Sequence, residues 1–273
     1  MFYLTYAPAP PLSEFVDYFW LFEGGQAARK ERIVPSGTME LVVNLRDDEI
    51  RLYDREQKER QRRYSGAVLS GTYSRILVID AMQHESMLGV HFKPGGAFPF
   101  LTVKASDLTD AHADLTDLWG RSARELRERL CSCNTFQERF HVMEEMLTAR
   151  LRRSQRVHPA VPRSLNYLTV AGASVRDVAR EVGICQRRLT KVFADQVGLS
   201  PKLFSRIYRF QRARFLADKT EEVVWAQLAS NCGYFDQSHL INDFQEFAGL
   251  TPVEYRRRHQ PDARLKSHHI ALP

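Results

Sequence analysis

The stretch VRDVAREVGICQRRLTKVFADQVGLSPKLF, residues 175–204, is followed by WAQLASNCGYFDQSHLINDFQEFAGLTPVEY, residues 225–255, which repeats its pattern. Each stretch has an apolar pair, Val178-Ala179 or Leu228-Ala229, that ends four residues before a glycine. The later positions that the two stretches share are Leu189 and Leu240, Phe193 and Phe244, Gly198 and Gly249, Pro201 and Pro252, and Phe204 and Tyr255. A helix, a glycine turn and a second helix, repeated once, predict two helix-turn-helix units in one chain.

In the first unit, the second helix is expected from about Cys185 to Gln196. At 100° per residue, Leu189, Val192 and Phe193 share one face, which must be the core. The opposite face carries Arg187 and Lys191, with Thr190 at its flank. A long guanidinium, a second cation and a short hydroxyl are the groups that a recognition helix needs to reach guanine and phosphate.

The second unit has the same geometry with fewer charges. Leu240 and Phe244 face the core, so Ser238 and Asn242 face outward, with Ile241 at the flank and Gln237 at the helix start. Amide side chains pair with adenine, and an isoleucine can contact a thymine methyl. We therefore expect the second unit to read its groove mainly through neutral groups.

A helix from Ser200-Pro201 to about Asp218 is expected between the two units, because serine caps a helix and proline fits its first turn. Its 18 residues span roughly 27 Å at 1.5 Å per residue, which suits two reading helices placed about one turn of DNA, roughly 34 Å, apart. Either solvent exposure or contact with phosphates explains the arginines along it, which are Arg206, Arg209, Arg212 and Arg214.

Charge is unevenly divided along the 273 residues. Residues 1–150 hold 19 Lys and Arg against 22 Asp and Glu, whereas residues 151–273 hold 20 against 11. A basic half joined to a slightly acidic half indicates that the C-terminal part meets a polyanion. We expect a domain over residues 1–151, a linker over 152–162, a second domain over 163–260 and a polar, frayed tail over 261–273.

The first domain is predicted to be mainly β, a cupin-like barrel with flanking helices, so that the whole chain is α+β. Short runs rich in β-branched and aromatic residues predict its strands: Phe19–Phe22, Met39–Leu45, Ala67–Leu69, Arg75–Ile79 and Met87–Phe92. The charged run Asp54–Arg63 is expected to be a solvated loop. Helices are expected over Ala123–Cys131 and Phe136–Leu151. The apolar stripe of the latter, which includes Phe140 and Leu147, packs either on the same domain or in a dimer interface.

Residues from about 160 to 258 resemble the DNA-binding domain of the AraC/XylS family of bacterial transcription regulators. The motifs that carry the resemblance are the twin units, GLSP, WAQLASNCGYFDQSHLINDF and GLTPVEYRRR. The resemblance implies base contacts at Arg187, Thr190, Lys191, Gln237, Ser238 and Asn242. We also expect Gln186 and Ile241 at the DNA interface, and we expect Arg206, Arg209 and Arg212 to contact phosphates. The family often has arginine where Asn242 stands, and Ile184-Cys185 replaces its usual serine cap.

The segments FVDYFWLFEG, IVPSGTMELVVNL and GVHFKPGGAFPF are similar to the sensor-like domain of a subgroup of that family. The resemblance implies double-stranded DNA as a partner and RNA polymerase as a second one if the protein is an activator, the commoner role in the family. It also implies a location in the cytoplasm and control by a small effector or by homodimerisation. The effector, the operator and the direction of regulation stay open.

Other functions find less support. The sequence lacks the phosphate-loop, nucleophile-elbow and HExxH motifs, and His91 stands alone on its predicted strand. No catalytic residue, metal ligand or cofactor is therefore expected. Cys131 and Cys133 are interpreted as inert thiols, and Cys185 and Cys232 as small buried residues. No signal peptide or membrane span is expected. A barrel enzyme with an added DNA module and an architectural DNA binder without a sensor are the alternatives.

Overall fold

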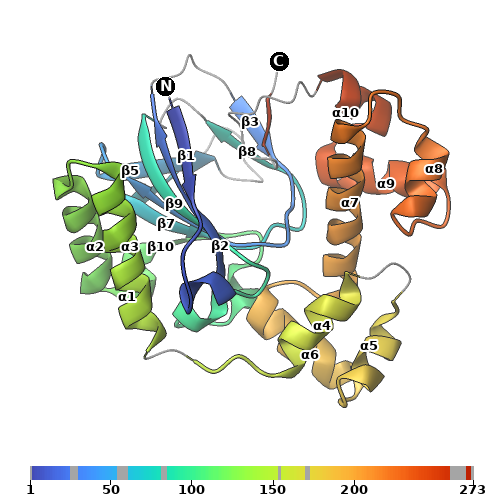
Figure 1. The fold of residues 1–273 in the computed structure, drawn as a ribbon, viewed down its shortest axis with the longest axis horizontal. Coiled ribbons are helices and arrows are strands. Elements are labelled where there is room, and N and C mark those ends of the chain that lie inside the picture. Colours follow the sequence, from blue (N-terminus) through green and yellow to red (C-terminus); the bar gives the residue numbers. More distant parts are fainter. Residues whose placement is uncertain are drawn as a thin grey trace.

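The computed structural model describes residues 2–24, 30–53, 61–80, 85–152, 155–169, 173–258 and 269–271. It is a mixed α and β structure in which an antiparallel N-terminal domain precedes a helical C-terminal domain (Figure 1). The strands are β1 (Phe2–Tyr6), β2 (Val16–Glu23), β3 (Lys30–Ile33), β4 (Glu40–Asn44), β5 (Glu49–Tyr53), β6 (Gln61–Ser65), β7 (Ala67–Ser70), β8 (Leu77–Asp80), β9 (Ser86–Phe92), β10 (His112–Asp114) and β11 (His269–Ala271).

The helices are α1 (Leu115–Trp119), α2 (Arg121–Ser132), α3 (Phe136–Leu151), α4 (Ala160–Leu168), α5 (Val175–Glu181), α6 (Gln186–Val197), α7 (Pro201–Lys219), α8 (Trp225–Asn231), α9 (Gln237–Ala248) and α10 (Pro252–Arg258). Short 3-10 turns are η1 (Leu12–Glu14), η3 (Phe98–Phe100) and η4 (Ala105–Leu108). Among the described residues, no helix has both the length and the apolar character needed to cross a membrane.

The N-terminal domain is built on a six-stranded sheet in the order β1-β2-β9-β4-β7-β10. Smaller sheets pair β11 with β3 and β8, and β5 with β6. Strand β4 alternates between half-buried and buried residues over Glu40–Val43, because successive side chains point to opposite faces, whereas its neighbour β9 is buried at every position. The predicted barrel is thus realised, over the described residues, as one large antiparallel sheet with two smaller ones.

Helices α2 and α3 cover one face of the large sheet (Figure 1). Phe140 stacks with both Phe19 and Tyr6, with ring centroids 6.3 and 5.5 Å away, and Leu147 is fully buried in the same cluster. The apolar stripe of α3 therefore packs on its own domain, and the alternative prediction that this stripe forms a dimer interface is wrong. The sheet needs this cover because its apolar face would otherwise meet water.

Several local predictions are corrected. Residues Gln61–Arg63 belong to strand β6 and not to a solvated loop, while 54–60 lie outside the described residues. His269–Ala271 pairs with β3, so this part of the tail is not frayed. Helix α4 begins at Ala160, inside the expected linker, whose residues 153 and 154 are not described.

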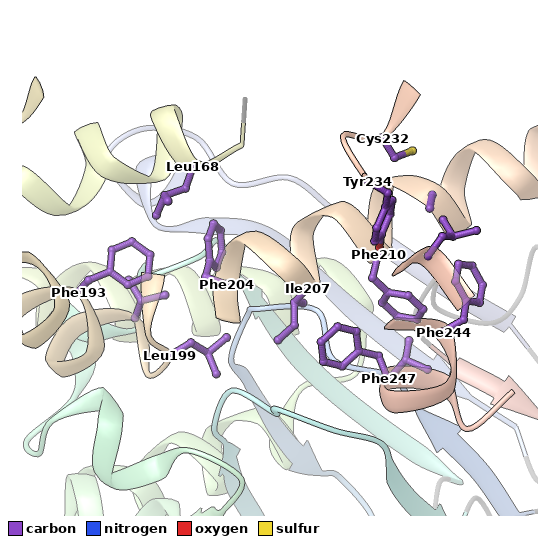
Figure 2. Packing of buried hydrophobic residues seen from close by; sticks show 14 of the residues in the cluster. Leu168, Phe193, Leu199, Phe204, Ile207, Phe210, Cys232, Tyr234, Phe244 and Phe247 are labelled. Atoms are coloured by element: carbon purple, nitrogen blue, oxygen red, sulfur yellow. The ribbon is translucent and has the colours of Figure 1, made fainter. Parts of the chain in front are cut away.

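Helix α7 is the spine of the C-terminal domain, and the two helix-turn-helix units pack on its two ends. Figure 2 shows Phe193 and Leu168 beside Phe204 at one end, and Phe244 and Phe247 beside Phe210 at the other. The ring centroids of Phe193 and Phe204 are 5.6 Å apart, and those of Phe210 and Phe244 are 5.0 Å apart. One continuous core therefore fixes α6 and α9 relative to each other.

The N-terminal domain docks onto the first unit and the spine. Gly198 ends α6 in a left-handed conformation (φ +87°), and a Cβ atom there would lie 2.3 Å from Thr72 Oγ1. Thr109 Oγ1 also donates to the Gly198 carbonyl. On α7, Phe204 packs against Gly37. The two domains therefore meet at the C-terminal end of α6 and along the first half of α7.

Candidate nucleic-acid interface

The first candidate reading helix is α6. Gly183 (φ +75°) forms the turn before it, and Cys185 occupies the N-cap position without a side-chain cap. Leu189 and Phe193 are fully buried, so the helix is held from one side only. The prediction that this helix lacks the usual cap is confirmed, whereas Cys185 is exposed and not a small buried residue.

The outward face of α6 carries the predicted polar residues. Gln186, Arg187, Thr190 and Lys191 are all exposed. Thr190 Oγ1 donates to the Gln186 carbonyl at 2.9 Å, and Lys191 Nζ lies 2.6 Å from an Asp195 carboxylate oxygen. Exposed ion pairs of this type contribute little to stability, so Lys191 can exchange Asp195 for another anion at small cost.

The second candidate reading helix is α9. Asp236 caps it, because its side chain accepts from the His239 backbone N–H at 2.7 Å. Gln237, Ser238 and Asn242 are exposed, and Ile241 is half-buried. Four of the predicted contacts of the second unit thus lie on or beside one outward face, and none of them carries a charge.

Two of the three arginines predicted to contact phosphate have another role. Arg206 forms ion pairs with Asp243 at 2.6 Å and Glu246 at 2.5 Å, and Asp243 is fully buried. Those carboxylates raise the pKa of the Arg206 guanidinium above its ordinary value, against the opposing effect of its burial. Arg209 donates to the Gly233 carbonyl at 3.1 Å and lies over the Tyr234 ring. Both arginines attach the second unit to α7, and their phosphate contact stays a prediction.

The other two arginines of α7 differ from each other. Arg214 is 2% exposed and lies over the rings of Phe210 and Tyr255, which excludes it from the surface. Arg212 is exposed, and its contact with a phosphate stays a prediction. Helical spacing separates these two residues, because Arg214 lies on the face of the buried Phe210 and Ala217, whereas Arg212 lies 200° away from Arg214.

A groove of about 540 Å³ runs between α6 and the N-terminal domain. Its walls include Arg188 and Asp195 from α6, Lys104 and Asp107 from the N-terminal domain, and His158 before α4. Lys104 Nζ lies 4.0 Å from Asp195, which also pairs with Lys191. One flank of the first reading helix is therefore in direct electrostatic contact with the N-terminal domain.

The sheet face opposite α2 and α3 holds a polar and aromatic cluster. Trp20 Nε1 donates to Glu40 Oε1 at 2.8 Å, His91 Nδ1 lies 3.7 Å from the same oxygen, and Tyr18 stacks on His91. Burial, with Glu40 nearby, raises the pKa of Tyr18, so its hydroxyl stays protonated. The buried His91 thus has a carboxylate beside it. Among the described residues, no group of three or more His, Cys, Asp or Glu side chains could hold a metal ion.

Residues that the sequence did not single out also lie at this interface. Arg188 is exposed beside Arg187, and Phe235, just before α9, is 94% exposed. The spacing in the sequence could have identified Phe235. Leu240 lies seven residues after Gly233, whereas Leu189 lies six residues after Gly183. The second turn therefore holds one extra residue, and that residue is apolar.

Comparison with known proteins agrees with this geometry. A helix-turn-helix domain model matches residues 178–258, and a model described as a domain of unknown function, DUF6597, matches residues 4–114. Residues 178–258 thus match a helix-turn-helix domain, and the two matches together support an AraC-type regulator with a separate N-terminal domain. The prediction of an AraC-type regulator from the twin units and of a distinct N-terminal domain is thereby confirmed.

Individual curated relatives match this chain over less than a third of its length. An HTH-type transcriptional regulator of Mycobacterium tuberculosis is 28% identical over 83 residues, 30% of this chain and 32% of that protein. The HTH-type transcriptional activator RhaR of an Enterobacter species is 32% identical over 73 residues, 27% of this chain and 26% of that protein. The chain therefore spans about a third or less of the length of these curated relatives.

Among solved structures, ToxT of Vibrio cholerae is 10% identical, with a TM-score of 0.43, 93% of this chain covered and 98% of ToxT. An AraC-type transcriptional regulator from Chromobacterium violaceum is 25% identical, with a TM-score of 0.35, 38% of this chain covered and 95% of that one.

Proposed function

We propose that this protein is a sequence-specific, DNA-binding transcription regulator whose helices α6 and α9 enter successive major grooves. The observation that carries the proposal is the pair of helix-turn-helix units on one rigid spine, each with its apolar face buried and its polar face exposed. This is the arrangement in which recognition helices meet base edges. The curated relatives, which are named as transcriptional regulators and not as enzymes, support the same conclusion.

Each helix is assigned contacts that suit its chemistry. On α6, Arg187 pairs with guanine, Lys191 meets guanine or phosphate, and Thr190 and Gln186 add shorter contacts. On α9, Asn242 and Gln237 pair with adenine, with Ser238 and Ile241 beside them. Arg212 is the exposed phosphate contact on α7. The exposure of these side chains, apart from the half-buried Ile241, supports the assignment.

Regulation is assigned to the N-terminal domain. Its contacts with Gly198 and with the first half of α7 connect it directly to the first reading unit. A small effector that shifts η4 or the segment before β4 would therefore change how α6 is held. We assign the protein to the cytoplasm and, on the likeness to an activator, propose activation through RNA polymerase. Homodimerisation, if it contributes, must use a surface other than the buried α3 stripe.

Binding selection tests the proposal most directly. The full-length protein should enrich a defined sequence from a random duplex library. If six to eight phosphates are neutralised, the logarithm of the association constant should fall with the logarithm of salt concentration at a slope of roughly −5 to −7. A slope near zero, or selection without enrichment, would contradict the proposal. Sequencing the genomic fragments that the protein selects would then identify its target genes.

A further inference from the structure

The turn that leads into α9 holds an apolar side chain in water. Phe235 is 94% exposed, while the residues on both sides of it are fixed. Tyr234 is buried, with Arg209 over its ring and its N–H donated to the Ala229 carbonyl, and Asp236 caps α9. The backbone of Phe235 is therefore held in place while its ring is left free for a partner.

Phe235 has no counterpart in the first unit. Tyr234 corresponds to Ile184, because each follows the turn glycine and packs against the core of the C-terminal domain. Phe235 is the extra residue between Gly233 and Leu240, so it is not needed to complete the packing. An aromatic ring that leaves water for an apolar contact gains free energy, which makes this position suited to binding and not to folding.

The position of Phe235 indicates which partner it meets. It directly precedes the first turn of α9, where Gln237 and Ser238 are exposed, and the N-terminal residues of a recognition helix contact base edges. A phenyl ring has no hydrogen-bond donor for a phosphate. The apolar group that the major groove offers is the C5-methyl of thymine, which phenylalanine side chains contact.

We propose that Phe235 is a specificity-determining residue that reads the C5-methyl group of one thymine in the half-site of the second unit. The proposal rests on the proposed DNA-binding function and adds a base preference to it. The neutral face of α9 would then combine amide contacts with one apolar contact. Ile241 is the internal comparison, because it is the other apolar candidate on α9 and is half-buried.

The test uses the full-length protein and the duplex that it selects from a random library. Each thymine is replaced singly by deoxyuridine, which lacks the methyl group, and Kd is measured for the wild type, Phe235→Ala and Ile241→Ala. Loss of one methyl contact should weaken wild-type binding about three- to fivefold at one thymine. That thymine should lie on the side where Asn242→Ala relaxes base preference.

Phe235→Ala should bind the unmodified duplex about as weakly as the wild type binds the uracil duplex, and should no longer respond to that replacement. Ile241→Ala should keep the response. Two controls separate base reading from a folding defect. Phe235→Ala should keep the melting temperature of the wild type, and Phe235→Leu should respond partly to the deoxyuridine replacement. If Phe235→Ala binds like the wild type, or if every uracil effect persists in it, the proposal is wrong, and Phe235 meets a protein instead. Failure of selection altogether would contradict the DNA-binding function itself.

Discussion

The two helix-turn-helix units share one sequence pattern but are anchored differently. The second unit is attached to α7 by polar side-chain interactions. Arg206 forms ion pairs with Asp243 and Glu246, and Arg209 donates a hydrogen bond to the Gly233 carbonyl. The first unit is anchored by packing against α7 and by the N-terminal domain at Gly198. A repeated pattern thus fixes the shape of each unit, while the residues outside the pattern decide what each unit is coupled to.

The exposed faces of α6 and α9 also differ in charge. The face of α6 carries Arg187 and Lys191, next to the N-terminal domain, whereas the face of α9 carries Asn242 and neutral neighbours. The more charged of the two helix faces is therefore the one next to the N-terminal domain. This difference suggests that control acts on affinity through α6, while α9 contributes a more constant base preference.

The largest expected effect concerns the anchor of the second unit. Arg206→Ala should lower the free energy of unfolding by about 3–5 kcal/mol, because it leaves the buried Asp243 carboxylate without its counter-charge. Urea unfolding followed by circular dichroism measures the loss. Arg212→Ala on the same helix is the matched control and should change stability by less than about 0.5 kcal/mol. Equal stability of the two variants would show that the ion pair does not anchor the unit.

The next effect compares the two glycines that end the reading helices. Gly249→Ala should cost about 1 kcal/mol, since both glycines have positive φ. Gly198→Ala should cost about 2–3 kcal/mol, because its Cβ also meets Thr72 of the N-terminal domain. Hydrogen exchange should then speed up in α6 for Gly198→Ala and leave α9 protected. A similar loss for both variants would mean that domain docking does not stabilise the first unit.

A smaller effect is expected on DNA binding itself. Arg187→Ala should weaken binding to the selected duplex by about 1–3 kcal/mol and relax the preference at one base pair, since a bidentate guanine contact is lost. Asn242→Ala should cost less and leave the salt dependence unchanged, because asparagine is neutral. DNA titrations of the wild type, Arg187→Ala and Asn242→Ala at several salt concentrations show which unit contributes more to affinity and base preference. If Arg187→Ala keeps both affinity and preference, α6 is not the main reader.

The smallest expected effect separates phosphate contact from base contact on α6. Lys191→Ala should reduce the magnitude of the salt slope by about one if its ammonium meets a phosphate in place of Asp195. The same titration on Arg212→Ala asks whether α7 adds a second phosphate contact. A Lys191→Ala slope equal to that of the wild type would place Lys191 at a base edge or outside the interface.

Much of this organisation was predictable from the sequence because it depends on local periodicity. The spacing of Leu189 and Phe193, and of Leu240 and Phe244, determined which face of each reading helix is buried, since both helices have one covered side. Most of the central strands were predictable for the same reason. Strands β1, β3, β5, β6, β10 and β11 were not predicted, because these short segments gain stability mainly from pairing with another strand.

Only the tertiary structure decided the roles of residues whose neighbours come from elsewhere in the chain. Arg206 and Arg209 lie only 60° apart on a helical wheel, so periodicity does not show that both bind groups of the second unit, which leaves them half-buried while Arg212 stays exposed. The docking of Thr72 and Gly37 against the C-terminal domain is likewise a contact between segments far apart in sequence. Periodicity determines which face of an element is buried. What covers that face, and how far the cover extends, depends on packing that no local pattern contains.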